Sequence, residues 1–103
     1  MLAIIARIEI NPAHIEEYIV AAAAAVEPTR AEAGCQWYGF GRDIKEPNVL
    51  WVSEQWESEA HLQAHLVSDH IGKLLADTAH LEIVAMEDRQ YEVSSVGKVN
   101  MPE

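Results

Sequence analysis

The first ten residues alternate between apolar positions and positions of mixed character. Every second side chain from Leu2 to Ile10 is apolar, whereas the positions between them include Arg7 and Glu9. Successive side chains of a β-strand point to opposite faces of a sheet. The pattern therefore predicts a strand over residues 2–10 that has one fully apolar face and one mixed face.

Helical spacing follows this strand. Asn11-Pro12 is a favourable start, because asparagine caps helices well and proline fits their first position. Apolar side chains then recur every three or four residues over 15–26, which is the spacing of one face of an α-helix. We predict a helix that begins at Asn11-Pro12, is kinked near Pro28 and ends at Gly34.

The middle of the chain has the composition of a β-hairpin. Residues 35–43 and 48–57 are rich in aromatic and β-branched side chains, which are typical of strands. The residues between them, 45–48, are turn formers. Two short helices then follow, one capped by Ser58 and extending to about residue 67, the other capped by Ser68 and extending to about residue 77.

Residues 80–93 alternate loosely and predict a last strand. The resulting order, β-α-β-β-α-β, is that of the ferredoxin-like fold in the α+β class, with an antiparallel four-stranded sheet and helices on one face. A chain of 103 residues suits one domain, which we place at residues 1–93, with a C-terminal tail at 94–103. The mixed face of strand 2–10 is too apolar to face water, so a second copy of the chain is its simplest cover.

Acidic residues outnumber basic ones by 17 to 7, which gives a formal charge of −10. Such a chain is repelled by phosphate backbones and anionic lipids, so we expect no nucleic-acid partner and no membrane binding. The single cysteine, Cys35, permits no intrachain disulfide. No stretch approaches the ~18 apolar residues of a membrane span, and the N-terminus lacks the form of a signal peptide. We therefore expect a cytoplasmic protein.

One carboxylate lies in an otherwise apolar row. Alternation along residues 48–57 places Glu54 on the same face as Leu50, Val52 and Trp56. If this face meets the helices, burial raises the pKa of Glu54 unless a cation or a hydrogen-bond donor stabilises its ionised form. Two roles remain open for Glu54: a structural residue that accepts a hydrogen bond from the backbone or a tryptophan indole, or a functional carboxylate.

A histidine is expected to face the same region. With roughly 100° between successive helical residues, His65 lies about 60° from Leu62 and within the stripe that Leu62 and Leu66 define. His65 should therefore point toward the sheet, on the side of Glu54. An inward histidine beside a carboxylate can act as an acid–base pair, although a hydrogen-bonded core histidine is the alternative.

Three histidines also raise the question of a metal site. His61 and His65 have the i, i+4 spacing that can bind zinc. However, the glutamate of the His-Glu-x-x-His motif is missing, and the two side chains should point in different directions. His70 follows on the next helix. We therefore expect no metal.

The segment that contains these residues resembles the antibiotic biosynthesis monooxygenase family, and its quinol-monooxygenase-like branch in particular. The resemblance is carried by Glu54-Gln-Trp-Glu-Ser-Glu-Ala-His-Leu-Gln-Ala-His65-Leu, followed by Ser68-Asp-His70. A second landmark is Glu32-Ala-Gly34-Cys35 with Tyr38 three residues later. The resemblance covers roughly residues 1–93.

The resemblance implies a fold and a chemistry. It implies a dimeric α+β barrel, in which the sheets of two subunits pack face to face. Several members of the family oxidise phenolic or quinol-type aromatics with O₂ and use no metal, flavin or haem. The ligand pocket of such enzymes lies between the sheet and the helices. The same superfamily includes an isomerase that acts on a sugar derivative, so the fold by itself does not determine the reaction.

A cofactor-free oxygenase needs a base in an apolar pocket, because the substrate must be deprotonated before it can give electrons to O₂. On this basis His65 is the predicted base and Glu54 the group that orients it or stabilises its charge. The other pocket residues that we predict are Trp56, Tyr38, Phe40, His70 and Trp37. Two alternatives remain: an isomerase or other enzyme on the same scaffold, and a small-molecule-binding module without turnover. Oxygen uptake would distinguish them.

Overall fold

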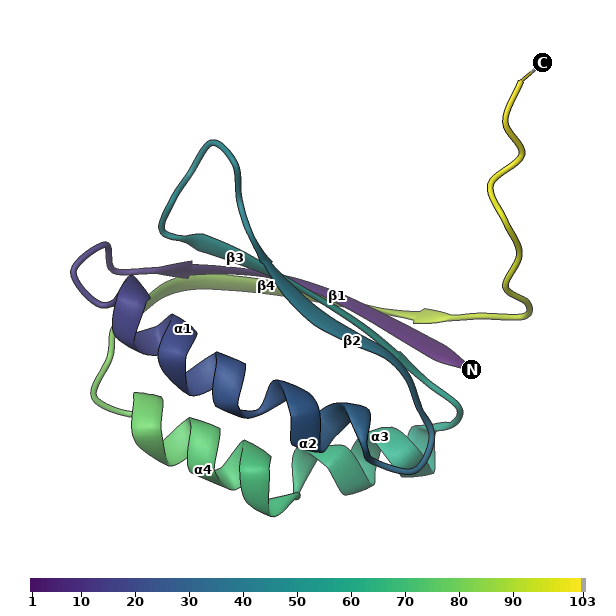
Figure 1. Ribbon diagram of the computed structural model, residues 1–103, viewed down its shortest axis with the longest axis horizontal. Coiled ribbons are helices and arrows are strands. Elements are labelled where there is room, and N and C mark those ends of the chain that lie inside the picture. Colours follow the sequence, from purple (N-terminus) through teal and green to yellow (C-terminus); the bar gives the residue numbers. More distant parts are fainter. Residues whose placement is uncertain (103) are drawn as a thin grey trace.

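Four strands form a single antiparallel sheet in the computed structural model, which describes residues 1–102 (Figure 1). The strands lie side by side in the order β2-β3-β1-β4. Their bounds are β1 (Leu2–Ile10), β2 (Cys35–Arg42), β3 (Val49–Trp56) and β4 (Ile83–Glu92). This arrangement confirms the predicted α+β class and ferredoxin-like sheet.

Strand β1 lies in the interior of the sheet, between β3 and β4. Its bounds match the prediction residue for residue, because the alternation of its side chains is regular. Leu2, Ala6, Ile8 and Ile10 are buried on the face that meets the helices. On the opposite face Ile5 remains 45% exposed, so the mixed face is uncovered within one copy of the chain.

The helices all cover the same face of the sheet (Figure 1). They are α1 (Ile15–Ala24), α2 (Val26–Arg30), α3 (Glu59–Leu66) and α4 (Asp69–Thr78). The element order is therefore β-α-α-β-β-α-α-β, in which a pair of short helices occupies each helical region of the ferredoxin-like pattern. The predicted caps of the second pair are present, since Ser58 Oγ accepts from the His61 amide and Ser68 Oγ accepts from the Ile71 amide.

The first helical region differs from the prediction at its start, at its break and at its end, since α2 ends at Arg30 and not at Gly34. Asn11 does not cap a helix; its side-chain oxygen accepts from the Ala13 amide and closes a turn, so that α1 begins at Ile15. The break between α1 and α2 falls at Ala25 rather than at Pro28. Proline has no N–H to donate to the carbonyl four residues earlier, and its ring crowds that carbonyl, so Pro28 ends the regular helix at Ala24.

The last strand begins later than predicted and lies at an edge of the sheet. The prediction was 80–93, whereas β4 spans Ile83–Glu92. All ten of its residues are exposed, because β4 pairs only with β1 and little packs over it. The described residues after β4 form no helix or strand and lead away from the sheet (Figure 1). The domain boundary at residue 93 stays a prediction.

The core is divided into two clusters between the sheet and the helices. One surrounds Ile10, Ile15 and Tyr18, and the other surrounds Trp56 and Leu62. Phe40 packs against both clusters. Within residues 1–102, none of the helices has the length and apolar character that crossing a bilayer requires.

Candidate active site

A cavity of about 340 Å³ lies between the sheet and helices α3 and α4. Most of its wall is apolar, with side chains from all four strands, from α1 and from both of these helices, and β4 contributes the polar side chains of Asp88 and Gln90. Two titratable side chains of that wall, Glu54 on β3 and His65 on α3, were predicted from the sequence to face each other. A mostly apolar cavity with a few convergent polar groups is the usual form of a small-molecule site.

His65 is held from several sides. It occupies the last turn of α3 and is only 3% exposed. Its ring lies against the indole of Trp56, with centroids 4.6 Å apart, and meets Tyr38 edge-on at 5.5 Å. Its Nδ1 atom is hydrogen-bonded to Glu32 Oε2 at 2.7 Å. Packing and this hydrogen bond together fix the orientation of the imidazole.

Glu54 approaches the other nitrogen of the same ring. Its Oε1 atom lies 3.8 Å from His65 Nε2 and accepts a hydrogen bond of 3.0 Å from Trp56 Nε1. Burial raises the pKa of Glu54, whereas the Trp56 hydrogen bond and the charge of His65 act in the opposite direction. The structure therefore brings Glu54 and His65 together, but at a separation beyond that of a direct hydrogen bond.

The direct carboxylate partner of His65 is Glu32, to which the sequence reasoning gave no role in the site. Glu32 lies in the turn between α2 and β2, and its Oε2 atom also bonds His70 Nε2 at 2.8 Å. Turn residues follow no periodicity, so spacing could not place this side chain. The only available signal was that Glu32 opens the second family landmark.

The other predicted pocket residues occupy four different positions. Tyr38 and Phe40 line the cavity, and burial strongly raises the pKa of the Tyr38 hydroxyl. Trp56 is fully buried behind His65 and supports that ring. His70 reaches His65 through Glu32. Trp37 is 65% exposed and lies outside the lining of this cavity.

Glu32, His65 and His70 form what we call the Glu–His–His cluster. One ligand atom from each lies within 4.8 Å of the other two, and two imidazoles with one carboxylate are a common ligand set for transition metals. Here the shared Glu32 oxygen is hydrogen-bonded to both rings. His61, which shares the i, i+4 spacing with His65, was expected to point in a different direction, and its Nδ1 atom bonds Ser58 Oγ instead.

Comparison with known proteins identifies the family. The sequence model of the family described as "Antibiotic biosynthesis monooxygenase" matches residues 1–77. The chain belongs to this family. The resemblance that the motifs indicated is thus confirmed, and membership of the antibiotic biosynthesis monooxygenase family supports the prediction of a monooxygenase.

Individual proteins of known sequence or structure also match this chain. "Probable quinol monooxygenase YgiN" of Escherichia coli (strain K12) is 31% identical over 99 residues, covering 86% of this chain and 94% of YgiN. "Uncharacterized protein sll1783" of Synechocystis is 28% identical over 87 residues, covering 84% of this chain but 59% of that protein, so the chain spans about three fifths of it. The crystal structure of PA3566 from Pseudomonas aeruginosa matches with a TM-score of 0.83 and 29% identity, covering 91% of this chain and 94% of PA3566.

Proposed function

We propose that this protein is a cofactor-independent monooxygenase that oxidises a quinol or polyphenol with O₂. The observation that carries the proposal is that His65, which lines a mostly apolar cavity, is hydrogen-bonded to the carboxylate of Glu32 behind it. The name of the YgiN relative, a probable quinol monooxygenase, supports the same substrate class.

The hydrogen bond to Glu32 suits His65 for the role of a general base. In a neutral imidazole one nitrogen donates and the other accepts. With Nδ1 bonded to the Glu32 carboxylate, we assign the ring proton to Nδ1 and the lone pair to Nε2. Glu32 then stabilises the imidazolium that forms when Nε2 takes a proton, as the carboxylate of a catalytic triad does.

The substrate hydroxyl would lose its proton to His65 Nε2, on the side of the ring that Glu54 approaches. The resulting quinolate gives electrons to O₂ much more readily than the neutral quinol does. Over the full reaction the substrate supplies four electrons to one O₂; one oxygen atom enters the product and the other leaves as water. Tyr38 and Phe40, on the cavity wall, would contact the flat ring of the substrate.

The test is oxygen consumption with a small panel of quinols and anthrone, carried out with and without air. We expect one O₂ to be consumed per product molecule, and no product without O₂. Replacing the base in a His65→Gln variant should lower kcat by about 10²-fold or more. His80→Gln, which changes an exposed histidine, is the matched control and should retain activity. Turnover without oxygen uptake would instead support an isomerase, and ligand binding without turnover would support a binding module.

We also propose that two copies of the chain pack their sheets together. The face opposite the helices exposes apolar area at Ile5 (45%), Trp51 (41%) and Tyr91 (45%), and a homodimer would cover it. Sedimentation should give twice the mass of one chain. Ile5→Asp should shift the protein to monomer, whereas Ile44→Asp, at a side chain that is already 100% exposed, should not. A monomeric native protein would contradict this proposal.

The cytoplasmic location that the sequence predicts remains part of the proposal. The only cysteine, Cys35, is free, and burial raises the pKa of its thiol. The less reactive thiol form is therefore favoured. A free structural cysteine is compatible with a reducing compartment.

A further inference from the structure

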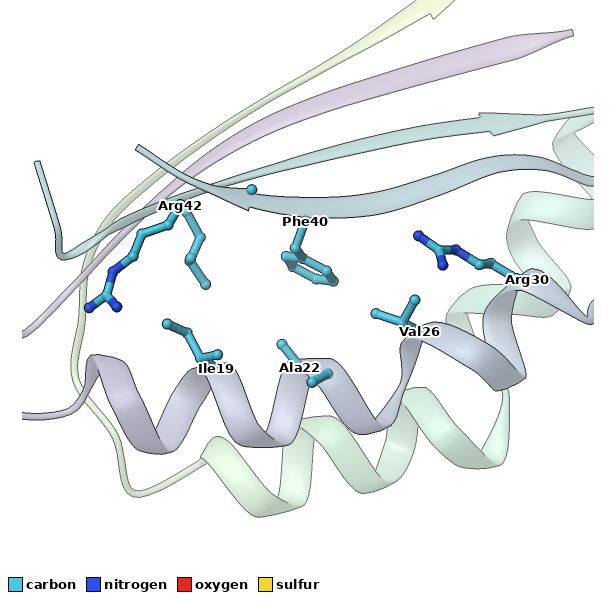
Figure 2. A pocket seen from close by; sticks show the side chains of 9 residues that line it. Ile19, Ala22, Val26, Arg30, Phe40 and Arg42 are labelled. Atoms are coloured by element: carbon cyan, nitrogen blue, oxygen red, sulfur yellow. The ribbon is translucent and has the colours of Figure 1, made fainter. Parts of the chain in front are cut away.

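A second cavity, of about 280 Å³, lies on the helix side of the sheet between α1 and β2. Figure 2 shows its two walls: Ile19, Ala22 and Val26 project from the helical side, and Phe40 projects toward them from β2. Among the described residues that line the two cavities, only Phe40 is shared with the cavity at His65. The cavity is large enough for a bicyclic aromatic acid or a medium-chain fatty acid.

An arginine lies at each end of this apolar cavity (Figure 2). The guanidinium of Arg42 is already neutralised, because its Nη2 atom pairs with Glu16 at 2.7 Å. Arg30 differs: within residues 1–102 its guanidinium forms no ion pair with a carboxylate, and its Nε atom donates to the Tyr38 carbonyl at 2.8 Å. That hydrogen bond holds the guanidinium at the cavity while its terminal nitrogens keep donors for another acceptor.

We propose that this cavity binds a small carboxylic acid, with the carboxylate on Arg30 and the apolar body between α1 and Phe40. Arginine pairs with carboxylates through two parallel hydrogen bonds, and a guanidinium held in place loses less entropy on binding. In a chain of formal charge −10, a local cation is what would let an anion bind at all. The inference goes beyond the proposed oxidation and does not depend on it.

The probe for the test is 2-naphthoate, compared with the uncharged 2-naphthamide, in equilibrium dialysis under anaerobic conditions. We expect 2-naphthoate to bind more tightly than 2-naphthamide. Arg30→Gln should weaken 2-naphthoate binding by about 10-fold or more and leave 2-naphthamide unchanged, because a charge-assisted hydrogen bond is lost.

A matched pair of variants separates filling of the cavity from loss of folding. Ala23 and Ala24 are neighbours on α1 and both are exposed, but only Ala23 lines the cavity. Ala23→Phe should abolish 2-naphthoate binding, and Ala24→Phe should not affect it. The pair keeps the test valid even if Arg30→Gln is unstable.

His65→Ala distinguishes the two cavities. If 2-naphthoate occupies the cavity at Arg30, binding survives in His65→Ala whether or not this variant oxidises quinols. If Ala23→Phe binds 2-naphthoate as the native protein does, the carboxylate site is overturned. Loss of 2-naphthoate binding in His65→Ala would then place the probe in the other cavity. Equal affinity for the acid and the amide would also overturn it.

Discussion

Replacing Glu32 with glutamine tests the central feature of the site, which is the carboxylate that orients His65. The substitution keeps the size and shape of the side chain but removes its charge. In the native protein one Glu32 oxygen accepts from two imidazoles, at 2.7 Å from His65 and 2.8 Å from His70. A glutamine oxygen in the same place could still accept from both imidazoles, but as a neutral acceptor it forms weaker hydrogen bonds than a carboxylate does.

The expected magnitude follows from these contacts. A hydrogen bond to a charged group contributes roughly 1.5–3 kcal/mol and one to a neutral group roughly 0.5–1.5 kcal/mol, so the weakening of both bonds should destabilise the fold by about 2–3 kcal/mol. For a domain of this size the melting temperature would fall by roughly 8–24 °C. Because a positioned base contributes about 10²–10⁴-fold to a rate, we expect kcat to fall by about 10²-fold or more. KM should change little, because Glu32 is not part of the cavity lining.

The assay is initial-rate oxygen uptake with a quinol, with the melting temperature measured at the same protein concentration. Glu27→Gln is the matched control, since Glu27 is an exposed glutamate on the neighbouring helix α2. Rates are compared well below the melting temperature of the variant, so that folded protein is measured in both cases. If Glu32→Gln kept kcat within about twofold, or if only KM changed, Glu32 would have no role in orienting the base.

Three further outcomes are expected. Burial raises the pKa of Glu54 above its ordinary value of 4.5. The stability that protonation of Glu54 gives to the fold is therefore complete below pH 4.5 and is lost as pH rises through the raised pKa. Because glutamine resembles the protonated form, Glu54→Gln should melt at a higher temperature than the native protein at pH 8 but not at pH 4. An equal shift at both pH values would contradict this. Gly34 has a φ of +80°, and an added Cβ would lie 2.2 Å from His61 Cγ, so Gly34→Ala should lower the urea midpoint of unfolding. At Gly72 nothing lies within 4 Å of an added Cβ, so Gly72→Ala should raise the urea midpoint, because alanine favours the helix more than glycine does. Dialysis against EDTA should leave quinol oxidation intact, whereas added Zn²⁺ should inhibit it through the Glu–His–His cluster; activity that is lost to EDTA and restored by a metal would refute a metal-free mechanism.

The parts of the fold with strong periodicity were predictable. Strand β1 was predicted residue for residue, because its alternating side chains face two different environments. The hairpin of β2 and β3 and the serine caps of α3 and α4 also follow from local signals. The errors lie where two local rules compete. The Asn11 side chain accepts from the Ala13 amide and closes a turn in place of capping a helix. Pro28 leaves the Ala24 carbonyl without its helical donor, so the helix breaks about one turn before the proline.

The candidate site was predictable only in part. Alternation along β3 and the angle of His65 on α3 indicated that Glu54 and His65 face each other, and their atoms approach within 3.8 Å. Periodicity gives the direction of a side chain to within tens of degrees. It cannot distinguish a contact at 3.8 Å from the hydrogen bond at 2.7 Å that His65 makes with Glu32.

Local patterns in the sequence were sufficient to predict the family, the sheet with its helices on one face, and the inward direction of His65 and Glu54. These features depend on local spacing and on the burial of apolar rows, and both can be recognised from the order of the residues. Which carboxylate bonds His65 became clear only from the folded chain, and so did the place of Arg30 at an apolar cavity, where its guanidinium pairs with no carboxylate of residues 1–102. Those contacts join residues from turns and helix ends, where no repeating pattern exists and where the packing of distant segments sets the distances.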